Sequence, residues 1–182
     1  MDPQLNTRRL HLRPFSYTDA KKVSKLADDP VIAATTQIPY PFTLEKAEDW
    51  IALHRGWMEK GSAYPFALVT WEEAELVGTI TIRIDKNHHK GELAYWIGKP
   101  YWGKGYATEA ARRVIRFGFE ELYLHRIWAQ VIHSNAASQK VLEYTGMSYE
   151  GTLKEDLYHQ GTYADVDIYG ILSSTYVSHE TK

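Results

Sequence analysis

Residues 95–110 of the chain read YWIGKPYWGKGYATEA, a pattern that predicts a strand, a tight glycine turn and a helix in direct succession. Glycine, present at 103 and 105, permits backbone conformations that other residues avoid. Successive N–H groups in such a turn converge on an anion, and the N-terminus of the following helix adds unpaired N–H groups and a positive dipole end. The stretch therefore predicts a phosphate-binding turn.

The composition narrows the class of protein. The chain has 182 residues, of which 44% are hydrophobic, and a net charge of -2. We expect one domain over residues 1–182 with its core at about 8–175. A near-neutral charge gives no general attraction to nucleic acid or to a membrane surface. Cysteine is absent from the sequence, which excludes disulfides, thiolate nucleophiles and cysteine metal sites. With no apolar signal or span of about 18 residues, we expect a cytoplasmic protein.

Strands and helices can be placed from hydrophobic periodicity and from capping residues. Hairpin-like strands come first, and strands then alternate with helices, so we expect a mixed α/β sheet in one domain. The strands are predicted at 8–14, 65–71, 76–84, 92–97, 126–132 and 164–172, and the helices at 17–27, 43–60, 108–124 and 135–144.

The glycine turn has three interpretations on its own. A dinucleotide fingerprint requires a third glycine where Thr108 stands, and an acidic residue about twenty positions later that is missing. A P-loop requires Lys and Ser or Thr after the last glycine, but Gly105 is followed by Tyr106. A turn that binds no ligand is the third interpretation, and the local pattern leaves it open.

Two further motifs carry a resemblance. Trp102–Ala107 resembles the acyl-CoA signature R/Q-x-x-G-x-G/A of the GNAT acetyltransferases, with tryptophan at the first position. Asn135–Met147 resembles the second signature, N-x-x-S/A before an apolar helix and a Gly-Phe pair, with Met147 replacing phenylalanine. The wording W-G-x-G-x-A-T-E-A resembles the RimJ/RimL-type branch, whose members acetylate N-terminal α-amines of ribosomal proteins.

The resemblance implies a fold and a reaction. The fold would be the GNAT fold, a mixed and mostly antiparallel sheet of about seven strands with a splayed central pair, flanked by about four helices. The reaction would move an acetyl group from acetyl-CoA, without a metal, to a primary amine such as a protein N-terminus. Direct attack in a ternary complex suits a chain without cysteine. A catalytically weak acyl-CoA-binding sensor or interaction module is the alternative, and the branch is consistent with a homodimer.

The resemblance also implies which residues hold the cosubstrate. Backbone groups of Tyr95, Trp96 and Ile97 would lie along the pantetheine, and Asn135 would meet the same arm while capping its helix. The remaining candidates are the amides that would take the diphosphate, namely those of Gly103, Lys104, Gly105, Tyr106, Ala107 and Thr108.

Catalytic residues are harder to transfer from the family. The position of a tyrosine acid found in several branches is Leu142 here, and that of a glutamate base is Gln130. Ser138 matches a serine of RimL-like enzymes that would protonate or solvate the leaving thiolate. Glu92 is the candidate base, with Asp165 and Asp167 as lesser ones. Because an α-amine has a pKa near 8, deprotonation costs only about 1 kcal/mol at neutral pH.

The acceptor cleft would be built by loops at 29–45 and 155–165. Tyr40 and Phe42, in a rigid proline-rich segment, are expected to shape its entrance. His88 and His89 form a turn pair without metal-ligand spacing, so we expect no metal there. The sequence carries no pattern that identifies the acceptor.

Overall fold

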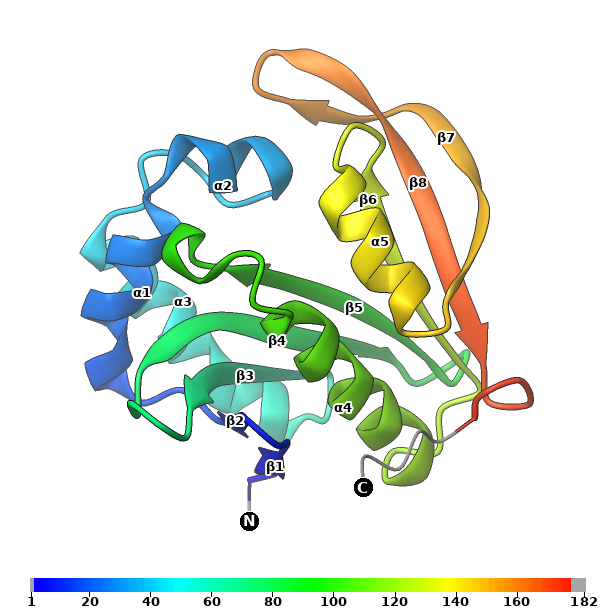
Figure 1. Cartoon of the computed structure of the whole chain (residues 1–182), viewed down its shortest axis with the longest axis horizontal. Helices are drawn as coiled ribbons and strands as arrows, with labels where there is room; N and C mark the ends of the chain where they lie inside the picture. Colours follow the sequence, from blue (N-terminus) through cyan, green and yellow to red (C-terminus); the bar gives the residue numbers. More distant parts are fainter. Residues whose placement is uncertain (1, 178–182) are drawn as a thin grey trace.

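One sheet organises the chain in the computed structural model, which describes residues 2–177 (Figure 1). Its strand order is β1-β2-β3-β4-β5-β6-β8-β7, and every neighbouring pair is antiparallel except β5 and β6. The strands are β1 (Leu5–Asn6), β2 (Leu10–Arg13), β3 (Ala63–Thr70), β4 (Leu76–Asp85), β5 (Lys90–Ile97), β6 (Arg126–Ile132), β7 (Ser148–His159) and β8 (Thr162–Leu172).

Helices cover both faces of this sheet. In Figure 1, α4 and α5 lie on one face, and α1 and α3 lie on the other. The helices are α1 (Ala20–Ala27), α2 (Pro30–Thr35), α3 (Leu44–Glu59), α4 (Tyr106–Glu120) and α5 (Ala136–Tyr144), with short 3-10 turns η1 (Tyr17–Asp19) and η2 (Lys99–Tyr101). The mixed α/β class and the mostly antiparallel sheet predicted from the sequence are confirmed.

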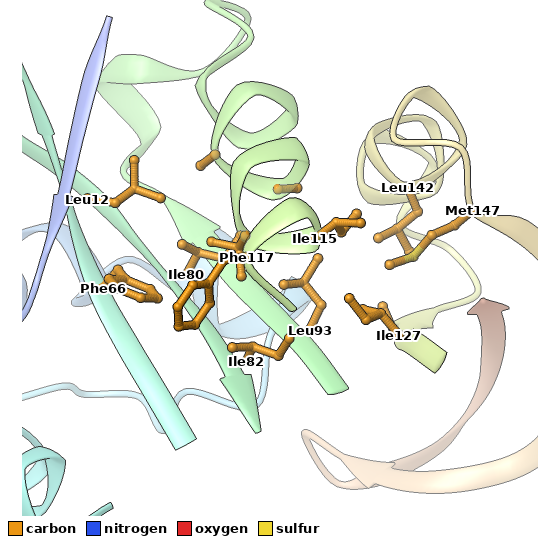
Figure 2. Packing of buried hydrophobic residues seen from close by; sticks show 14 of the residues in the cluster. Leu12, Phe66, Ile80, Ile82, Leu93, Ile115, Phe117, Ile127, Leu142 and Met147 are labelled. Atoms are coloured by element: carbon orange, nitrogen blue, oxygen red, sulfur yellow. The ribbon is translucent and has the colours of Figure 1, made fainter. Parts of the chain in front are cut away.

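Alternation along the central strands produces two hydrophobic cores, because successive side chains of a strand point to opposite faces. On β3, Phe66 and Leu68 pack beneath α4, whereas Ala67 and Val69 pack beneath α1 and α3. Figure 2 shows the α4 core, in which Phe117 stands over the central strands. This core extends to Leu142 and Met147, which anchor α5, and it thereby fixes α5 beside α4.

The structure adds the short strand β1 and two longer elements to the sequence prediction. The segment expected to be a loop at 29–45 contains α2, which Asp29 caps through its side chain and which has Pro30 at its first position. The segment before β8 forms β7, so that residues 155–165 are the end of a long hairpin. The helix predicted at 108–124 begins at Tyr106, directly after Gly105.

The two parallel strands separate soon after they meet. β5 pairs with β6 only where Lys90–Glu92 face Arg126–Trp128. Beyond Glu92, residues 93–97 of β5 keep their pairing with β4 and, among the described residues, have no partner strand on the other side. The divergence leaves a gap between the two strands at the centre of the sheet; in Figure 1, α5 lies over it, and the β7–β8 hairpin lies beyond β6. This is the splayed central pair expected from the sequence.

Candidate functional site

The glycine turn lies where β5 ends and α4 begins. Gly103 and Gly105 adopt φ angles of 75° and 77°, a left-handed conformation that a side chain disfavours. A Cβ added at Gly103 would meet nothing within 4 Å, so the turn is open on that side. Both glycines are therefore present for backbone conformation, as the sequence predicted.

The first turn of α4 is available to an anion. Gly105 is its N-cap residue, and no side chain of the described residues hydrogen-bonds to the cap. The N–H groups at the start of a helix have no intrahelical partner. The amides of Tyr106, Ala107 and Thr108 thus begin a helix without a capping side chain, beside an open glycine turn. This arrangement fits the diphosphate of acetyl-CoA.

The open edge of β5 leads from the gap to this turn. Tyr95 and Ile97 face the α4 core, and Trp96, which is 9% exposed, faces the α1 and α3 core. The backbone of these three residues borders the gap, as expected for contacts along the pantetheine. The Ile97 carbonyl already accepts a hydrogen bond from Trp102 Nε1 at 2.6 Å. That bond ties the start of the glycine turn back onto the strand.

The second motif faces the same edge from α5. Asn135 caps the helix, since its Oδ1 accepts a hydrogen bond from Ser138 N at 3.1 Å. Its Nδ2 also donates to Thr35 O on α2, at 3.5 Å. Asn135 therefore has the capping role that the sequence predicted, and it also bridges α5 to α2.

Ser138 contacts a residue of the open edge. The hydroxyl oxygens of Ser138 and Tyr95 are 2.8 Å apart. Burial raises the pKa of Tyr95 to about 12, against a smaller opposing effect of the Ser138 hydrogen bond. Tyr95 is consequently a neutral hydroxyl at physiological pH, and the pair can relay a proton across the gap.

Glu92 lies on the other face of β5. It is four residues before Trp96, so the two side chains share a face, opposite to that of Tyr95. Glu92 stands at the last position where β5 pairs with β6, and its Oε1 is 3.3 Å from Arg83 Nη1 on β4. Glu92 therefore lies on one face of β5, whereas Ser138 contacts Tyr95 on the other face.

The two predicted entrance residues differ in exposure. Tyr40 is 57% exposed, whereas Phe42 is 8% exposed and packs with α1 and α3. The Phe42 N–H also donates to Asp28 Oδ1 at 2.9 Å. Phe42 therefore anchors the loop from beneath, and of the pair only Tyr40 presents a large surface.

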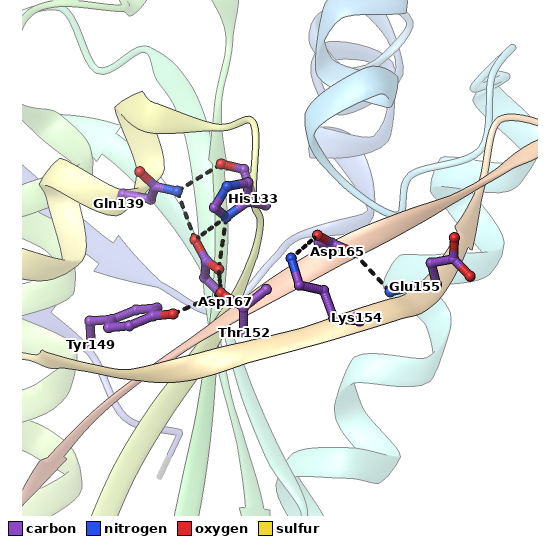
Figure 3. Close-up of polar contacts among 8 residues, drawn as sticks. All are labelled: His133, Gln139, Tyr149, Thr152, Lys154, Glu155, Asp165 and Asp167. Atoms are coloured by element: carbon purple, nitrogen blue, oxygen red, sulfur yellow. Dashed lines mark hydrogen bonds and ion pairs between the residues drawn. The ribbon is translucent and has the colours of Figure 1, made fainter.

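A polar network that the sequence did not indicate joins β6, α5 and the hairpin (Figure 3). Buried Asp167 accepts hydrogen bonds from Thr152, Gln139 and the His133 ring, at 2.5 to 3.0 Å. Burial acts to raise the pKa of Asp167, but these hydrogen bonds outweigh it and lower the pKa. The residues are 15 to 34 positions from Asp167 in the chain, so no local spacing could have revealed the cluster.

Next to this network is a cavity of about 370 Å³ at the end of β6. Asp165 lies on its wall, where the carboxylate binds Lys154 Nζ at 2.7 Å and accepts from Glu155 N at 2.9 Å. The hairpin also contacts α2, since His159 Nε2 lies 3.2 Å from Ala34 O. The cavity is lined by Ile132, His133, Ser134, Glu155, Tyr163, Ala164 and Asp165.

Two negative findings concern residues 2–177. No group of three or more histidine, cysteine or acidic side chains in that range could hold a metal ion. No helix within the same range is long and apolar enough to cross a bilayer.

Comparison with known proteins gives a consistent result. Residues 9–148 match the family model described as an acetyltransferase (GNAT) domain. The uncharacterized N-acetyltransferase p20 of Bacillus licheniformis is 33% identical over 174 residues, which cover 94% of this chain and 97% of that protein.

Two solved structures extend the comparison. A GNAT-family acetyltransferase from Bacillus anthracis superposes with a TM-score of 0.86 at 29% identity, covering 94% of this chain and 99% of the other. RimJ of Mycobacterium smegmatis, solved with a CoA disulfide, gives a TM-score of 0.83 at 25% identity, covering 94% and 87%.

Proposed function

The chain belongs to the GNAT family of acetyl-CoA-dependent N-acetyltransferases, and from this premise we propose that it acetylates a protein N-terminal α-amine by direct attack in a ternary complex. One observation supports the proposal most strongly, the unpaired edge of β5 between Glu92 and Gly98. This edge leads from the sheet's central gap to the glycine turn, so donor and acceptor can meet on it.

The donor would be held by backbone groups. The amides of residues 103–108 bind its diphosphate, because the helix N-terminus and the glycine turn present unpaired N–H groups to one place. The free edge of β5 at Tyr95–Ile97 lies along the pantetheine, and Asn135 holds the other wall. Acetyl-CoA supplies an activated thioester when it is bound.

Ser138 would donate a hydrogen bond or a proton to the leaving sulfur of the donor. Its hydroxyl lies 2.8 Å from the Tyr95 hydroxyl, and a hydroxyl in such a pair can donate a proton while receiving another. The high pKa of Tyr95 keeps that hydroxyl protonated. Ser138 would therefore solvate the departing thiolate by a hydrogen bond or pass it the Tyr95 proton, which solvent then restores to Tyr95.

Glu92 would accept a proton from the attacking ammonium, directly or through water. It stands where β5 and β6 part, so its carboxylate, or a water bound to it, would reach the amine as the amine approaches the thioester carbonyl within the gap. An α-amine has a pKa near 8, and a weak base is sufficient for it. The carboxylate of Glu155 at the cavity beside the hairpin favours a positively charged acceptor, whereas that of Asp165 is paired with Lys154.

A panel of acceptors tests this function. The purified protein is mixed with acetyl-CoA, and release of free thiol is followed with peptides that have a free N-terminus, with the same peptides blocked there but carrying lysine, and with polyamines. Purified ribosomal proteins form the last group, because the RimJ/RimL-type resemblance suggests them. We expect turnover with free N-termini, and a mass increase of one acetyl group at the first residue.

The outcomes separate the competing functions. Turnover only with polyamines or lysine side chains would overturn the N-terminal acceptor while leaving the enzyme class intact. Tight CoA binding without turnover on any amine would favour the acyl-CoA-binding module suggested by Leu142 and Gln130, which occupy the positions of the family's common acid and base.

A further inference from the structure

Arg9 forms a clamp between the N-terminal strands and the glycine turn. Its Nε and Nη2 each lie 2.6 Å from Glu109 Oε2 in the first turn of α4. Its Nη1 donates to Lys104 O at 2.9 Å, and its guanidinium lies 4.9 Å from the centre of the Tyr106 ring. One side chain thus contacts three residues of the turn and the helix that follows it.

The contact with Lys104 O orients a peptide group of the turn. A trans peptide is planar, and its carbonyl and the next N–H point in opposite directions. Because Arg9 holds the Lys104 carbonyl on its own side, the N–H of Gly105 is directed to the other side of the turn. Arg9 therefore fixes the direction of one amide among those that form the anion site.

The contact with Glu109 removes an unfavourable charge. A carboxylate in the first turn of α4 stabilises the helix, yet it would repel a diphosphate bound at the same N-terminus. Burial acts to raise the pKa of Glu109, but hydrogen bonds from Thr7 and from the Arg9 backbone and side chain outweigh it and lower the pKa. Glu109 is thus ionised, and the Arg9 guanidinium is the cation that neutralises it.

We propose that Arg9 is a positioning residue for the diphosphate of acetyl-CoA, acting through the Lys104 carbonyl and the Glu109 carboxylate. The inference rests on the proposed placement of the diphosphate at residues 103–108. It assigns a binding role to a residue almost a hundred positions before the glycine turn, in the connection between β1 and β2 and outside the two signatures at 102–107 and 135–147.

The test compares donors with and without the diphosphate. Coenzyme A affinity is measured by calorimetry, and turnover is measured with acetyl-CoA and with S-acetylpantetheine, which lacks the diphosphate and nucleoside. Arg9→Gln should weaken coenzyme A binding about tenfold, the size expected from losing a charge-assisted contact. Its kcat/KM for S-acetylpantetheine should stay within about twofold of the parent. Arg9→Lys should fall between the two proteins, because it restores the charge without the planar fork.

Two further variants make the result specific. Gly105→Ala tests the turn itself and should also weaken coenzyme A binding, since the residue has a φ of 77°. Arg55→Gln is the matched control, because it removes an exposed arginine that pairs with Glu59 on α3. The control should leave both donors unaffected.

Each result has one interpretation. If Gly105→Ala weakens coenzyme A binding and Arg9→Gln does not, the proposed role of Arg9 is wrong and the donor site stands. If neither variant changes coenzyme A affinity, the diphosphate site itself is misplaced. If Arg9→Gln impairs both donors equally, Arg9 has a purely structural role and the inference is overturned.

Discussion

The hydroxyl oxygens of Tyr95 on β5 and Ser138 on α5 lie 2.8 Å apart, and they join the two walls of the gap in which β5 and β6 part. The pair is the only contact between hydroxyl side chains across that gap among the described residues. Burial raises the pKa of Tyr95 to about 12, so its hydroxyl stays protonated and can donate a hydrogen bond throughout the physiological range. The leaving sulfur of the donor would be released beside it.

Replacing Ser138 by alanine should therefore slow the chemical step. We expect Ser138→Ala to lower kcat by about 10- to 100-fold, near the lower range of general acid catalysis, with little change in KM for acetyl-CoA. Steady-state kinetics at saturating acceptor measure the effect. Ser148→Ala, at an exposed position of β7, is the control. An unchanged kcat in Ser138→Ala would remove the serine from the mechanism.

Glu92→Gln should have a small effect that depends on pH. At pH 7 most of an α-amine is protonated, and we expect kcat/KM to fall about tenfold; at pH 9 most of it is neutral, and the ratio of parent to variant should approach one. A pH profile of kcat/KM for the acceptor measures this trend. Glu59→Gln, which removes another carboxylate paired with an arginine, should follow the parent at every pH. A deficit that is constant with pH would contradict the role of base.

Gly78 on β4 pairs with Ile97 at the end of β5 and should not tolerate a side chain. A Cβ there would stand 2.4 Å from the Trp96 carbonyl oxygen and 3.0 Å from Ile97 Cα. We expect Gly78→Ala to lower the free energy of unfolding by about 1–3 kcal/mol and to raise KM for acetyl-CoA, since the open edge must shift. Urea unfolding and donor kinetics measure the two effects.

Gly56→Ala is the matched control for this substitution. It lies within α3, and a Cβ there would meet nothing within 4 Å. Alanine should raise the free energy of unfolding by up to about 1 kcal/mol, because glycine is unfavourable in a helix interior. The reverse order of stability in the two variants would show that the close approach of β4 and β5 does not exclude a side chain at Gly78.

His54 should make the free energy of unfolding decrease at acidic pH. This residue is 2% exposed, its ring lies among Phe15, Trp50 and Trp57, and neither ring nitrogen makes a hydrogen bond to any described residue. Burial lowers its pKa to about 4, below the usual 6.5, so the unfolded chain binds the proton first as the pH falls. The contribution of the neutral His54 ring to the free energy of unfolding is fully present above about pH 6.5. It falls by up to about 3 kcal/mol as the pH approaches 4.

The variant His54→Phe should remove this part of the acid sensitivity. Urea unfolding at pH 7 and pH 4.5 measures the difference, and exposed His88→Gln serves as the control. Because phenylalanine also removes two buried polar atoms without partners, the variant should be at least as stable as the parent at pH 7. Equal acid sensitivity in parent and His54→Phe would assign the loss to other groups.

Local patterns predicted some elements well. β6 was predicted at 126–132 and found there, because alternation along it is regular and turn residues bound it. The helix α3 begins where Thr43 caps it, accepting a hydrogen bond from Lys46 N. In both cases the determining residues are neighbours in the chain, so the sequence alone is sufficient.

Other elements depend on distant partners. β7 is largely exposed and is interrupted where Leu153–Leu157 shift register against β8, which hides the alternation of a strand. The helix α2 is short, although its signals, Asp29 and Pro30, were present. The clamp of Arg9 on Glu109 joins residues 100 positions apart, and no local pattern can indicate such a pair.

The short pairing of β5 with β6 has a consequence for how such a chain can diversify. Within the described residues, the sheet continues from β5 into β6 and the hairpin of β7 and β8 only through the pairing of Lys90–Glu92 with Arg126–Trp128. If the hairpin and α2 bind the acceptor as proposed, changes in them would alter the acceptor side while the glycine turn, α4 and β5 keep their structure. Proteins with the same proposed acetyl-CoA site could in this way differ in the acceptor that they bind.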